Sequence, residues 1–193
     1  MERQAHFFFA ISLPEEAKRE VKKICSFVQQ EFPFRRWVHY EDYHITLAFL
    51  GAASNDKLEE AKRIVKERLN GQKAFSLHIN QLGVFGKEDT PRIFWADTAK
   101  EERLMMIRDI VFSACLQAGF ELETRPFKPH ITLARNWAGI NLFQSSQLKN
   151  NNPFQNAHLS FQANEVVLYQ THLDQTPKYE KVASFPLLDE NLF

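Results

Sequence analysis

The chain has 193 residues, of which 44% are hydrophobic and 25% are charged, a composition typical of a globular protein rather than a disordered or fibrous one. Its 24 basic and 24 acidic side chains cancel, which argues against a protein that holds long nucleic acids mainly by neutralising phosphates. No apolar stretch reaches the length of a membrane span, and the run FFFAISL lacks the flanks of a secretory leader. We therefore expect a single cytoplasmic domain, residues 1–193, that does not bind membranes.

Two strand and helix units open the chain. Residues 6–13 predict a buried strand, and residues 13–32 predict a helix with Pro14 in its first turn. After a break at 32–38, the alternating residues 43–51 predict a second strand, and a second helix follows before Gly71. The order is strand, helix, strand, helix.

The rest of the chain favours antiparallel pairing. Residues 75–86 and 91–99 alternate and are joined by the polar turn KEDT, which predicts a hairpin. The remaining predicted elements are a helix at 101–120, a strand at 127–135, a short helix and loop within the weakly patterned 139–154, and strands within 158–173 and 179–187. Hairpins among three long helices favour an α+β fold over a doubly wound parallel sheet.

The pentapeptide HITLA occurs twice. The copies start at residues 44 and 130, an offset of 130 − 44 = 86 residues, which is close to half the chain. Each copy lies among strands and helices of similar make-up. This spacing predicts an internal duplication into two α+β lobes, each with its own sheet and one copy of the motif.

Strand geometry divides this motif into two faces. Successive side chains alternate, so His44 and Thr46 share one face while Ile45 and Leu47 share the other. The same division holds for the copy at 130–133. One H-x-T carries little weight, because a histidine on a strand is usually structural and threonine is a good strand former. Core packing, however, gives no reason for the polar face to repeat residue for residue.

If the two strands face one another across a cleft, His44 and His130 converge on one substrate. A neutral and a protonated imidazole form a general base and a general acid, which suits in-line displacement at phosphorus without a metal or another cofactor. Thr46 and Thr132 would donate hydrogen bonds to the phosphate oxygens, and Arg135 would add a positive charge there. Sequence reasoning leaves open which histidine is the acid.

Other kinds of site find little support. No HExxH, paired cysteines or carboxylate at ligand spacing indicates zinc, and no G-x-S-x-G indicates a serine nucleophile. Two lone thiols, Cys25 and Cys115, are expected to be reduced core residues. The histidines without a repeated context are expected to be structural or on the surface: His6, His39, His78, His158 and His172.

Several segments in chain order resemble the bacterial and archaeal RNA 2′,3′-cyclic phosphodiesterases, also called 2′-5′ RNA ligases, of the 2H phosphoesterase superfamily. They are FFAISLP, RWVHYEDYHITLAFLG, PRIFWAD and RPFKPHITLAR. The resemblance spans about residues 7 to 135. It implies a bilobal α+β fold with two antiparallel sheets facing each other across a cleft and helices outside, with the motifs 44–47 and 130–133 in separate lobes.

The resemblance also implies metal-independent hydrolysis of RNA 2′,3′-cyclic phosphate ends to 2′-phosphomonoesters, with 2′-5′ ligation as the reverse reaction. It makes His44 the proton donor and His130 the proton acceptor. The implied substrate-binding residues are Thr46, Thr132, Arg135 and Phe8, whose ring would approach the terminal base. Arg36 and Trp37 match the flank of the first motif without an implied role.

Two other functions stay open. The same chemistry would serve small nucleotide or sugar cyclic phosphates, and a binding module would hold RNA or a nucleotide without reaction. Binding alone has no need of two groups that titrate near neutrality, which favours an enzyme. The expected partners are RNA ends or nucleotides bearing a 2′,3′-cyclic phosphate, without an obligatory protein partner.

Overall fold

The computed structural model describes residues 5–154 and 159–189. The helices are α1 (Glu15–Glu31), α2 (Asn55–Leu69), α3 (Glu102–Gln117) and α4 (Ser146–Asn150), with one 3-10 turn, η1 (Tyr40–Asp42). The strands are β1 (His6–Ser12), β2 (Phe34–Trp37), β3 (His44–Ala52), β4 (Phe75–Gly86), β5 (Pro91–Thr98), β6 (His130–Trp137), β7 (Ser160–Ala163), β8 (Glu165–Thr171) and β9 (Tyr179–Pro186).

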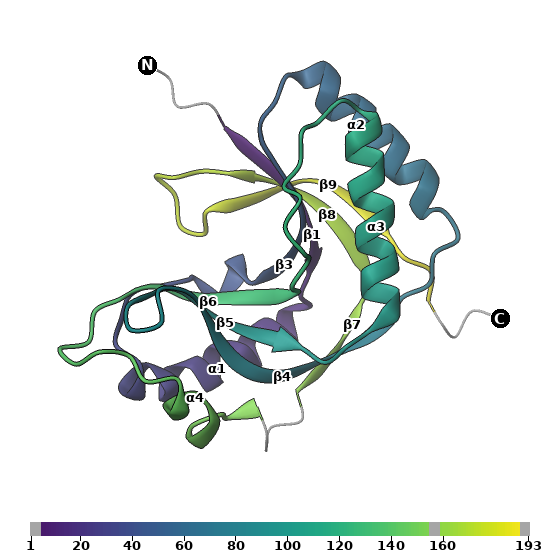
Figure 1. Ribbon diagram of the computed structural model, residues 1–193. Coiled ribbons are helices and arrows are strands. Elements are labelled where there is room, and N and C mark those ends of the chain that lie inside the picture. Colours follow the sequence, from purple (N-terminus) through teal and green to yellow (C-terminus); the bar gives the residue numbers. More distant parts are fainter. Residues whose placement is uncertain (1–4, 155–158, 190–193) are drawn as a thin grey trace.

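The strands form one strongly bent antiparallel sheet in the order β7-β4-β5-β6-β3-β1-β8-β9, and β2 pairs with β6 (Figure 1). The central strands β3 and β6 meet through one residue pair, Ile45 and Ile131. In this order four strands lie on either side of the junction, and β2 adds a fifth on the side of β6. The predicted α+β class with antiparallel pairing is confirmed, whereas the two expected sheets are joined here into one.

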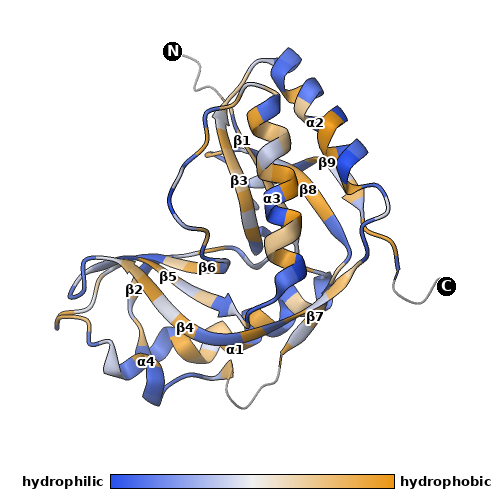
Figure 2. Cartoon of the chain, turned by 45° about the vertical axis from the view of Figure 1, so that its right-hand side comes forward, coloured by the Kyte–Doolittle hydropathy of each residue, from blue (hydrophilic) through white to orange (hydrophobic). Residues whose placement is uncertain are grey.

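Helices cover the outer side of the bent sheet. In Figure 1, α2 and α3 lie together against the half that contains β1, β3 and β8, while α1 and α4 lie against the half that contains β4. Helix α1 buries Ala17, Val21, Cys25 and Val28, whose spacing puts them on one face. Figure 2 shows hydrophobic colour along β3 and β8, in the half of the sheet that α2 and α3 cover.

The core is continuous across the junction. Phe9 in β1, Ile45 in β3 and Leu133 in β6 all belong to one hydrophobic cluster and are fully or almost fully buried. Cys25 and Cys115 are free and buried, as expected, and burial raises the pKa of Cys115 to about 12. The two halves of the sheet therefore share one packed interior.

The chain crosses between the two halves of the sheet. Strands β8 and β9 come late in the sequence but pair beside β1, whereas the early hairpin β4–β5 pairs beside β6. Each half thus combines strands from both ends of the chain. The internal duplication predicted from the spacing of the two motifs stays a prediction.

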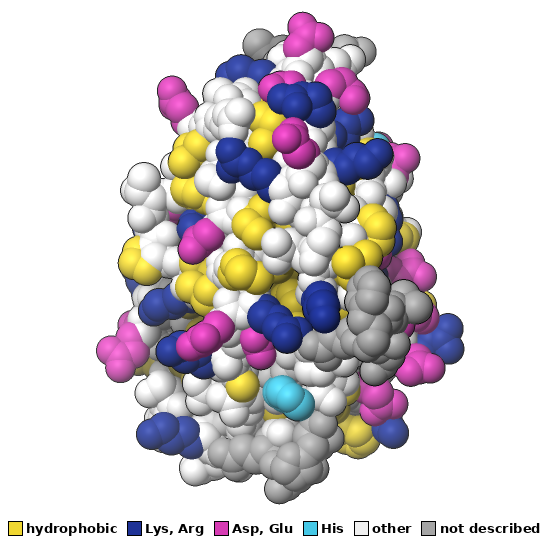
Figure 3. All heavy atoms as spheres, turned by 90° about the vertical axis from the view of Figure 1, so that its right-hand side faces the viewer, with side chains coloured by type: hydrophobic (Ala, Val, Ile, Leu, Met, Phe, Trp, Pro, Cys, Tyr) yellow, Lys and Arg dark blue, Asp and Glu magenta, His cyan; other side chains and the backbone are white. Residues whose placement is uncertain are grey.

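One strand was not predicted. Strand β2, Phe34–Trp37, lies within the expected break at 32–38 and buries only Phe34, so four residues carry too little alternation to identify it. The hairpin β4–β5 and the short helix α4 agree with the sequence. Within 5–154 and 159–189, no helix is long and apolar enough to cross a membrane. On the face shown in Figure 3, acidic and basic side chains are interspersed.

Candidate active site

The two motifs lie on the central strands β3 and β6. Antiparallel pairing of Ile45 with Ile131 sets His44 across from Thr132, and Thr46 across from His130. Both isoleucines are fully buried, while the histidines and threonines are only partly buried. The predicted division of HITLA into a core face and an open face agrees with this geometry.

Backbone carbonyls orient both imidazoles in the same way. Nδ1–H of His44 donates to the carbonyl of Asp42 at 2.7 Å, and Nδ1–H of His130 donates to the carbonyl of Lys128 at 2.7 Å. In each case the carbonyl lies two residues before the histidine. A carbonyl can only accept, so Nδ1 carries the proton and Nε2 is the atom left for chemistry.

Burial makes both imidazoles hard to protonate. The pKa of His44 is lowered to about 4, mainly by burial; the imidazole of His130 and the positive charges of Lys18 and Arg135 contribute to that shift, and the Asp42 carbonyl opposes it. Burial also lowers the pKa of His130, and Arg135 adds to that shift. Both rings are therefore neutral at pH 7 in the free protein.

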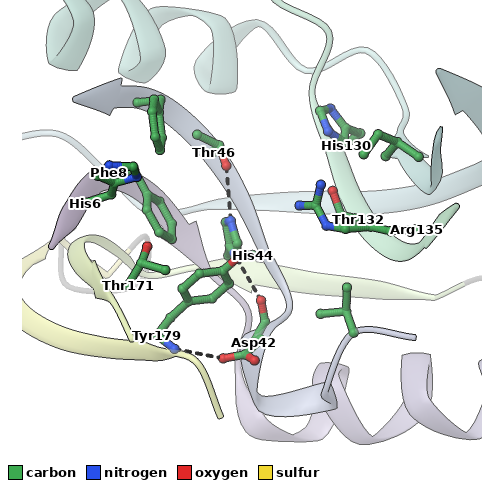
Figure 4. A pocket seen from close by; sticks show the side chains of 13 residues that line it. His6, Phe8, Asp42, His44, Thr46, His130, Thr132, Arg135, Thr171 and Tyr179 are labelled. Carbon is green, nitrogen blue, oxygen red and sulfur yellow. Dashed lines mark hydrogen bonds between the residues drawn. The ribbon is translucent and has the colours of Figure 1, made fainter. Parts of the chain in front are cut away.

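All six predicted site residues line one cavity of about 310 Å³. They are His44, Thr46, His130, Thr132, Arg135 and Phe8 (Figure 4). The side chain of Thr46 lies beside His44, with Oγ1 3.1 Å from Nε2. The other three polar residues come from β6, so the cavity is formed jointly by the two halves of the sheet.

Phe8 forms the wall of the cavity behind His44. Its ring is 4% exposed and lies 4.8 Å from the His44 ring, between centroids, and 4.9 Å from that of Tyr179. So little exposed surface leaves the ring packed against the imidazole. The predicted contact of Phe8 with a base stays a prediction.

Asp42 and Tyr179 line the same cavity and were not predicted. The Asp42 carboxylate is buried and accepts hydrogen bonds from the backbone N–H groups of Lys178 at 2.9 Å and Tyr179 at 3.1 Å. The Tyr179 ring lies edge-on to His44, 5.1 Å away. More than 130 residues separate Asp42 from its partners, and no local pattern marks such a contact.

The remaining histidines differ in where they lie relative to the cavity. His6 lines the edge of the cavity, where its ring meets Phe49 edge-to-face at 5.9 Å. His39, His78 and His172 are not among the residues that line it. His158 lies outside the described residues. No group of three or more His, Cys, Asp or Glu side chains within the described ranges is arranged to hold a metal ion.

The two flanking residues of the first motif lie on β2. Arg36 is exposed and pairs in register with Arg135 on β6, so both side chains belong to the same face of the ladder. Trp37 packs edge-on against the buried Phe94 at 5.8 Å. Trp37 is thus a core contact, and Arg36 adds a second positive charge near the cavity.

Comparison with known proteins agrees with this geometry. The family model described as LigT like Phosphoesterase matches residues 11–95 and 97–179, and each matched span contains one HITL motif. The chain belongs to the LigT-like phosphoesterase family. Its α+β fold is also that of the crystal structure of Escherichia coli LigT complexed with 3′-AMP, which superposes with a TM-score of 0.77 at 24% identity, over 96% of this chain and 99% of that one.

Two relatives in this family carry the name RNA 2′,3′-cyclic phosphodiesterase. The protein from Geobacillus stearothermophilus is 42% identical over 186 residues, which cover 96% of this chain and 58% of that protein. The protein from Bacillus subtilis is 35% identical over 182 residues, covering 94% of this chain and 96% of the relative. The chain thus spans less than two thirds of the first LigT-like relative and nearly all of the second.

Proposed function

We propose that this protein hydrolyses the 2′,3′-cyclic phosphate at the end of an RNA strand to a 2′-phosphomonoester, without a metal. The observation that carries the proposal is the equivalent pair of imidazoles, His44 and His130, whose Nδ1 atoms are both bound by a carbonyl and whose side chains line one cavity. Two relatives named for this reaction support the choice of substrate.

In this mechanism His130 is the base and His44 the acid. Nε2 of His130 takes a proton from water, the water oxygen forms a bond to phosphorus, and the bond from phosphorus to the 3′-oxygen breaks. Nε2–H of His44 gives its proton to that oxygen. The products are a 2′-phosphomonoester and a free 3′-hydroxyl, so each imidazole ends in the state in which the other began.

The other polar residues bind the phosphate. Thr46 and Thr132 would donate hydrogen bonds to the non-bridging oxygens, where negative charge grows in the transition state, and the Arg135 guanidinium would pair with the same oxygens. Their positions in the cavity support this role. The anionic phosphate also favours the imidazolium, which raises the low pKa of His44 and lets it act as an acid.

The same site would join RNA ends when a 5′-hydroxyl replaces water as the nucleophile, which is the 2′-5′ ligation expected from the sequence. We further propose that residues 1–193 are one bilobal domain that arose by duplication, with one motif in each lobe. The two successive family matches support this origin. A cytoplasmic location is part of the proposal and agrees with two free, buried cysteines.

Single substitutions test the mechanism. His44→Ala and His130→Ala should each lower kcat on a short RNA ending in a 2′,3′-cyclic phosphate by roughly a hundredfold or more, because each removes one proton transfer. Affinity for the 2′-phosphate product should change much less. Full turnover of both variants with a chelator present would rule out the two-histidine mechanism, and a 3′-phosphate product would rule out the proposed bond cleavage.

Substrate choice is tested separately. Turnover of the short RNA is compared with that of a mononucleoside 2′,3′-cyclic phosphate under the same conditions. We expect kcat/KM for the RNA to equal or exceed that for the mononucleoside. A strong preference for the mononucleoside would leave the chemistry intact and overturn the assignment to RNA ends.

A further inference from the structure

A second cavity lies beside the proposed catalytic base. It has a volume of about 210 Å³ and shares only His130 with the first cavity. Three of its lining side chains are aromatic, and two others carry oxygen atoms: Phe85, Trp95, Phe127, Asp97 and Thr98. An aromatic hollow with a few polar atoms is the usual form of a site for a planar ligand.

The register of the sheet places the aromatic rings next to the catalytic residues. Trp95 pairs across β5 and β6 with Thr132, and Asp97 pairs with His130, so these side chains share one face. Between centroids, the Trp95 ring lies 5.0 Å from Phe85, which in turn meets His130 edge-on at 4.9 Å. A row of rings therefore extends from the imidazole to the indole.

A glycine allows Trp95 to lie flat on the sheet. On the other side of β5, Trp95 pairs with Gly83, and a Cβ atom built on that glycine would lie 2.0 Å from the indole ring. Any other residue at position 83 would push the ring out of place. The orientation of the indole thus depends on the identity of a single neighbouring residue.

Two residues that line this cavity each carry a buried polar atom without a hydrogen-bond partner among the described residues. These atoms are Nε1 of Trp95 and Oγ1 of Thr98, and Thr98 is 6% exposed. Buried polar groups are nearly always paired, because an unpaired one loses its hydration without compensation. Asp97 differs, since Gln81 donates to both its carboxylate oxygens at 3.0 and 3.1 Å. Of the two unpaired groups, only the indole N–H belongs to the face that carries Asp97 and His130, because Thr98 alternates to the opposite face of β5 with the buried Phe94 and Ala96.

The equivalent space beside His44 is filled. There Phe8, Tyr169 and Tyr179 pack around the imidazole with centroid distances of 4.8, 5.9 and 5.1 Å. Phe8 and Tyr169 belong to a small buried cluster on that face of the sheet. The two histidines are oriented alike but differ in their surroundings: three rings pack around His44, whereas a cavity of about 210 Å³ lies beside His130.

We propose that the cavity lined by Trp95 and Phe85 binds the nucleobase of the nucleoside that carries the cyclic phosphate. This inference rests on the proposed function, since it names where that substrate places its base. Stacking on the rings would accept any base, because every base has an aromatic face.

The test compares two substrates that differ only in the base. One is a nucleoside 2′,3′-cyclic phosphate, and the other is the same cyclic phosphate on 1,4-anhydroribitol, a ribose ring with hydrogen in place of the base. For the unsubstituted protein, kcat/KM should be about tenfold to a hundredfold higher with the base than without it, which is the usual effect of stacking.

Two variants should remove this advantage. Trp95→Ala deletes the indole, and Gly83→Ala keeps it but displaces it, so both should lower kcat/KM for the nucleoside substrate by about tenfold or more. Turnover of the base-free substrate should stay within about twofold. The conservative Gly83→Ala variant decides the question if Trp95→Ala does not fold.

Gly139→Ala is the matched control. A Cβ atom there would lie 2.4 Å from the Trp137 ring, so it displaces a tryptophan that does not line either cavity. The ratio of its kcat/KM values for the nucleoside and base-free substrates should equal that of the unsubstituted protein. Phe49→Ala tests a competing position for the base, because that exposed ring lines the first cavity.

The outcomes separate the two proposals. If the unsubstituted protein hydrolyses both substrates equally well, or if Phe49→Ala removes the advantage while Trp95→Ala and Gly83→Ala keep it, the base site is wrong and the proposed function stands. If neither substrate is hydrolysed, the proposed function fails and the base site with it. Loss of turnover on both substrates in Gly83→Ala would make Trp95 a structural residue and also overturn the inference.

Discussion

His44 and His130 owe their orientation to carbonyl groups only two residues away in the sequence. Such a local contact survives changes elsewhere in the protein, provided that the strand begins at the histidine, as β3 and β6 do. The tautomer of each imidazole is therefore set by the backbone. Side chains further away control a different property, namely how readily each ring takes up a proton.

The low pKa of His44 predicts a loss of stability in acid. The pKa is about 4 in the folded protein and 6.5 in the reference state, so the unfolded chain binds more protons between these values. The free energy of unfolding should therefore fall as pH decreases from 6.5 to 4, by about 3 kcal/mol at most. Urea unfolding across this range measures the effect.

His44→Gln is the comparison for that measurement. It removes the titrating group, so its stability should fall less steeply over the same pH range, and the remaining slope includes His130, whose pKa is also lowered. His78→Gln, outside the cavity, should keep the full slope. Equal slopes for His44→Gln and the unsubstituted protein would contradict a neutral, buried His44.

Much of the arrangement of the site residues could be predicted from the alternation of side chains along a strand. His44 was predicted to share a face with Thr46, and His130 with Thr132, because spacing along one strand determines it. The surroundings of each ring could not be predicted. Phe85 and Trp95 lie beside His130 because β5 pairs with β6 in a particular register. The sequence of one strand does not determine its register with another strand.

The β8–β9 hairpin is held to the site by one carboxylate. Asp42 ends the turn η1, its carbonyl orients His44, and its side chain binds the N–H groups at the start of β9. One residue therefore links His44 to the strand that supplies Tyr179. Neither η1 nor this contact was predicted, because a three-residue turn has no periodicity and its partner is distant in the chain.

Asp42→Asn should weaken both stability and catalysis. The new amide group would face backbone N–H donors, so a buried hydrogen bond is lost at a cost of about 1–3 kcal/mol. We expect Tyr179 to move away from His44 and kcat/KM on cyclic-phosphate RNA to fall about tenfold. Unfolding in urea and steady-state kinetics measure these effects.

Asp174→Asn provides the control within the same hairpin, because this residue is exposed. It should leave both the free energy of unfolding and kcat/KM unchanged within error. If Asp42→Asn keeps full kcat/KM although its free energy of unfolding falls, then the hairpin stabilises the fold without positioning the site.

The junction of the two half-sheets depends on buried aliphatic contact more than on hydrogen bonds. Ile45 and Ile131 form the one pair between β3 and β6, and both are fully buried within the shared core. Ile131→Ala should therefore lower the free energy of unfolding by about 2–5 kcal/mol. The transition should stay a single cooperative one, since both halves share that core.

Denaturant unfolding followed by tryptophan fluorescence and by circular dichroism tests this expectation. Val182→Ala on β9 is the control, because that side chain is 38% exposed and its truncation should cost less than about 0.5 kcal/mol. Two separate transitions in the Ile131→Ala variant would show that the halves unfold independently and would contradict a common core.

The α+β class and the order of the elements could be predicted from the sequence. The pairing of the β4–β5 hairpin beside β6, and of β8 and β9 beside β1, could not. Alternation and turn chemistry identify β4–β5 as a hairpin but do not say which motif strand it joins. Likewise, nothing local in β8 or β9 indicates that they pair beside β1 rather than continue the later half. Partner choice between distant strands depends on packing of the whole core, which single segments do not encode.

The pairing of β8 with β1 also has a consequence for biosynthesis. A ribosome makes the chain from its N-terminal end, and domains fold as units once their parts have emerged. β1 is made well before its second neighbour, β8, which ends at Thr171. Until then one edge of β1 is open to unwanted pairing. The segment that supplies Tyr179 follows later still, so a nascent chain cannot complete the cavity around His44 before β9 leaves the ribosome.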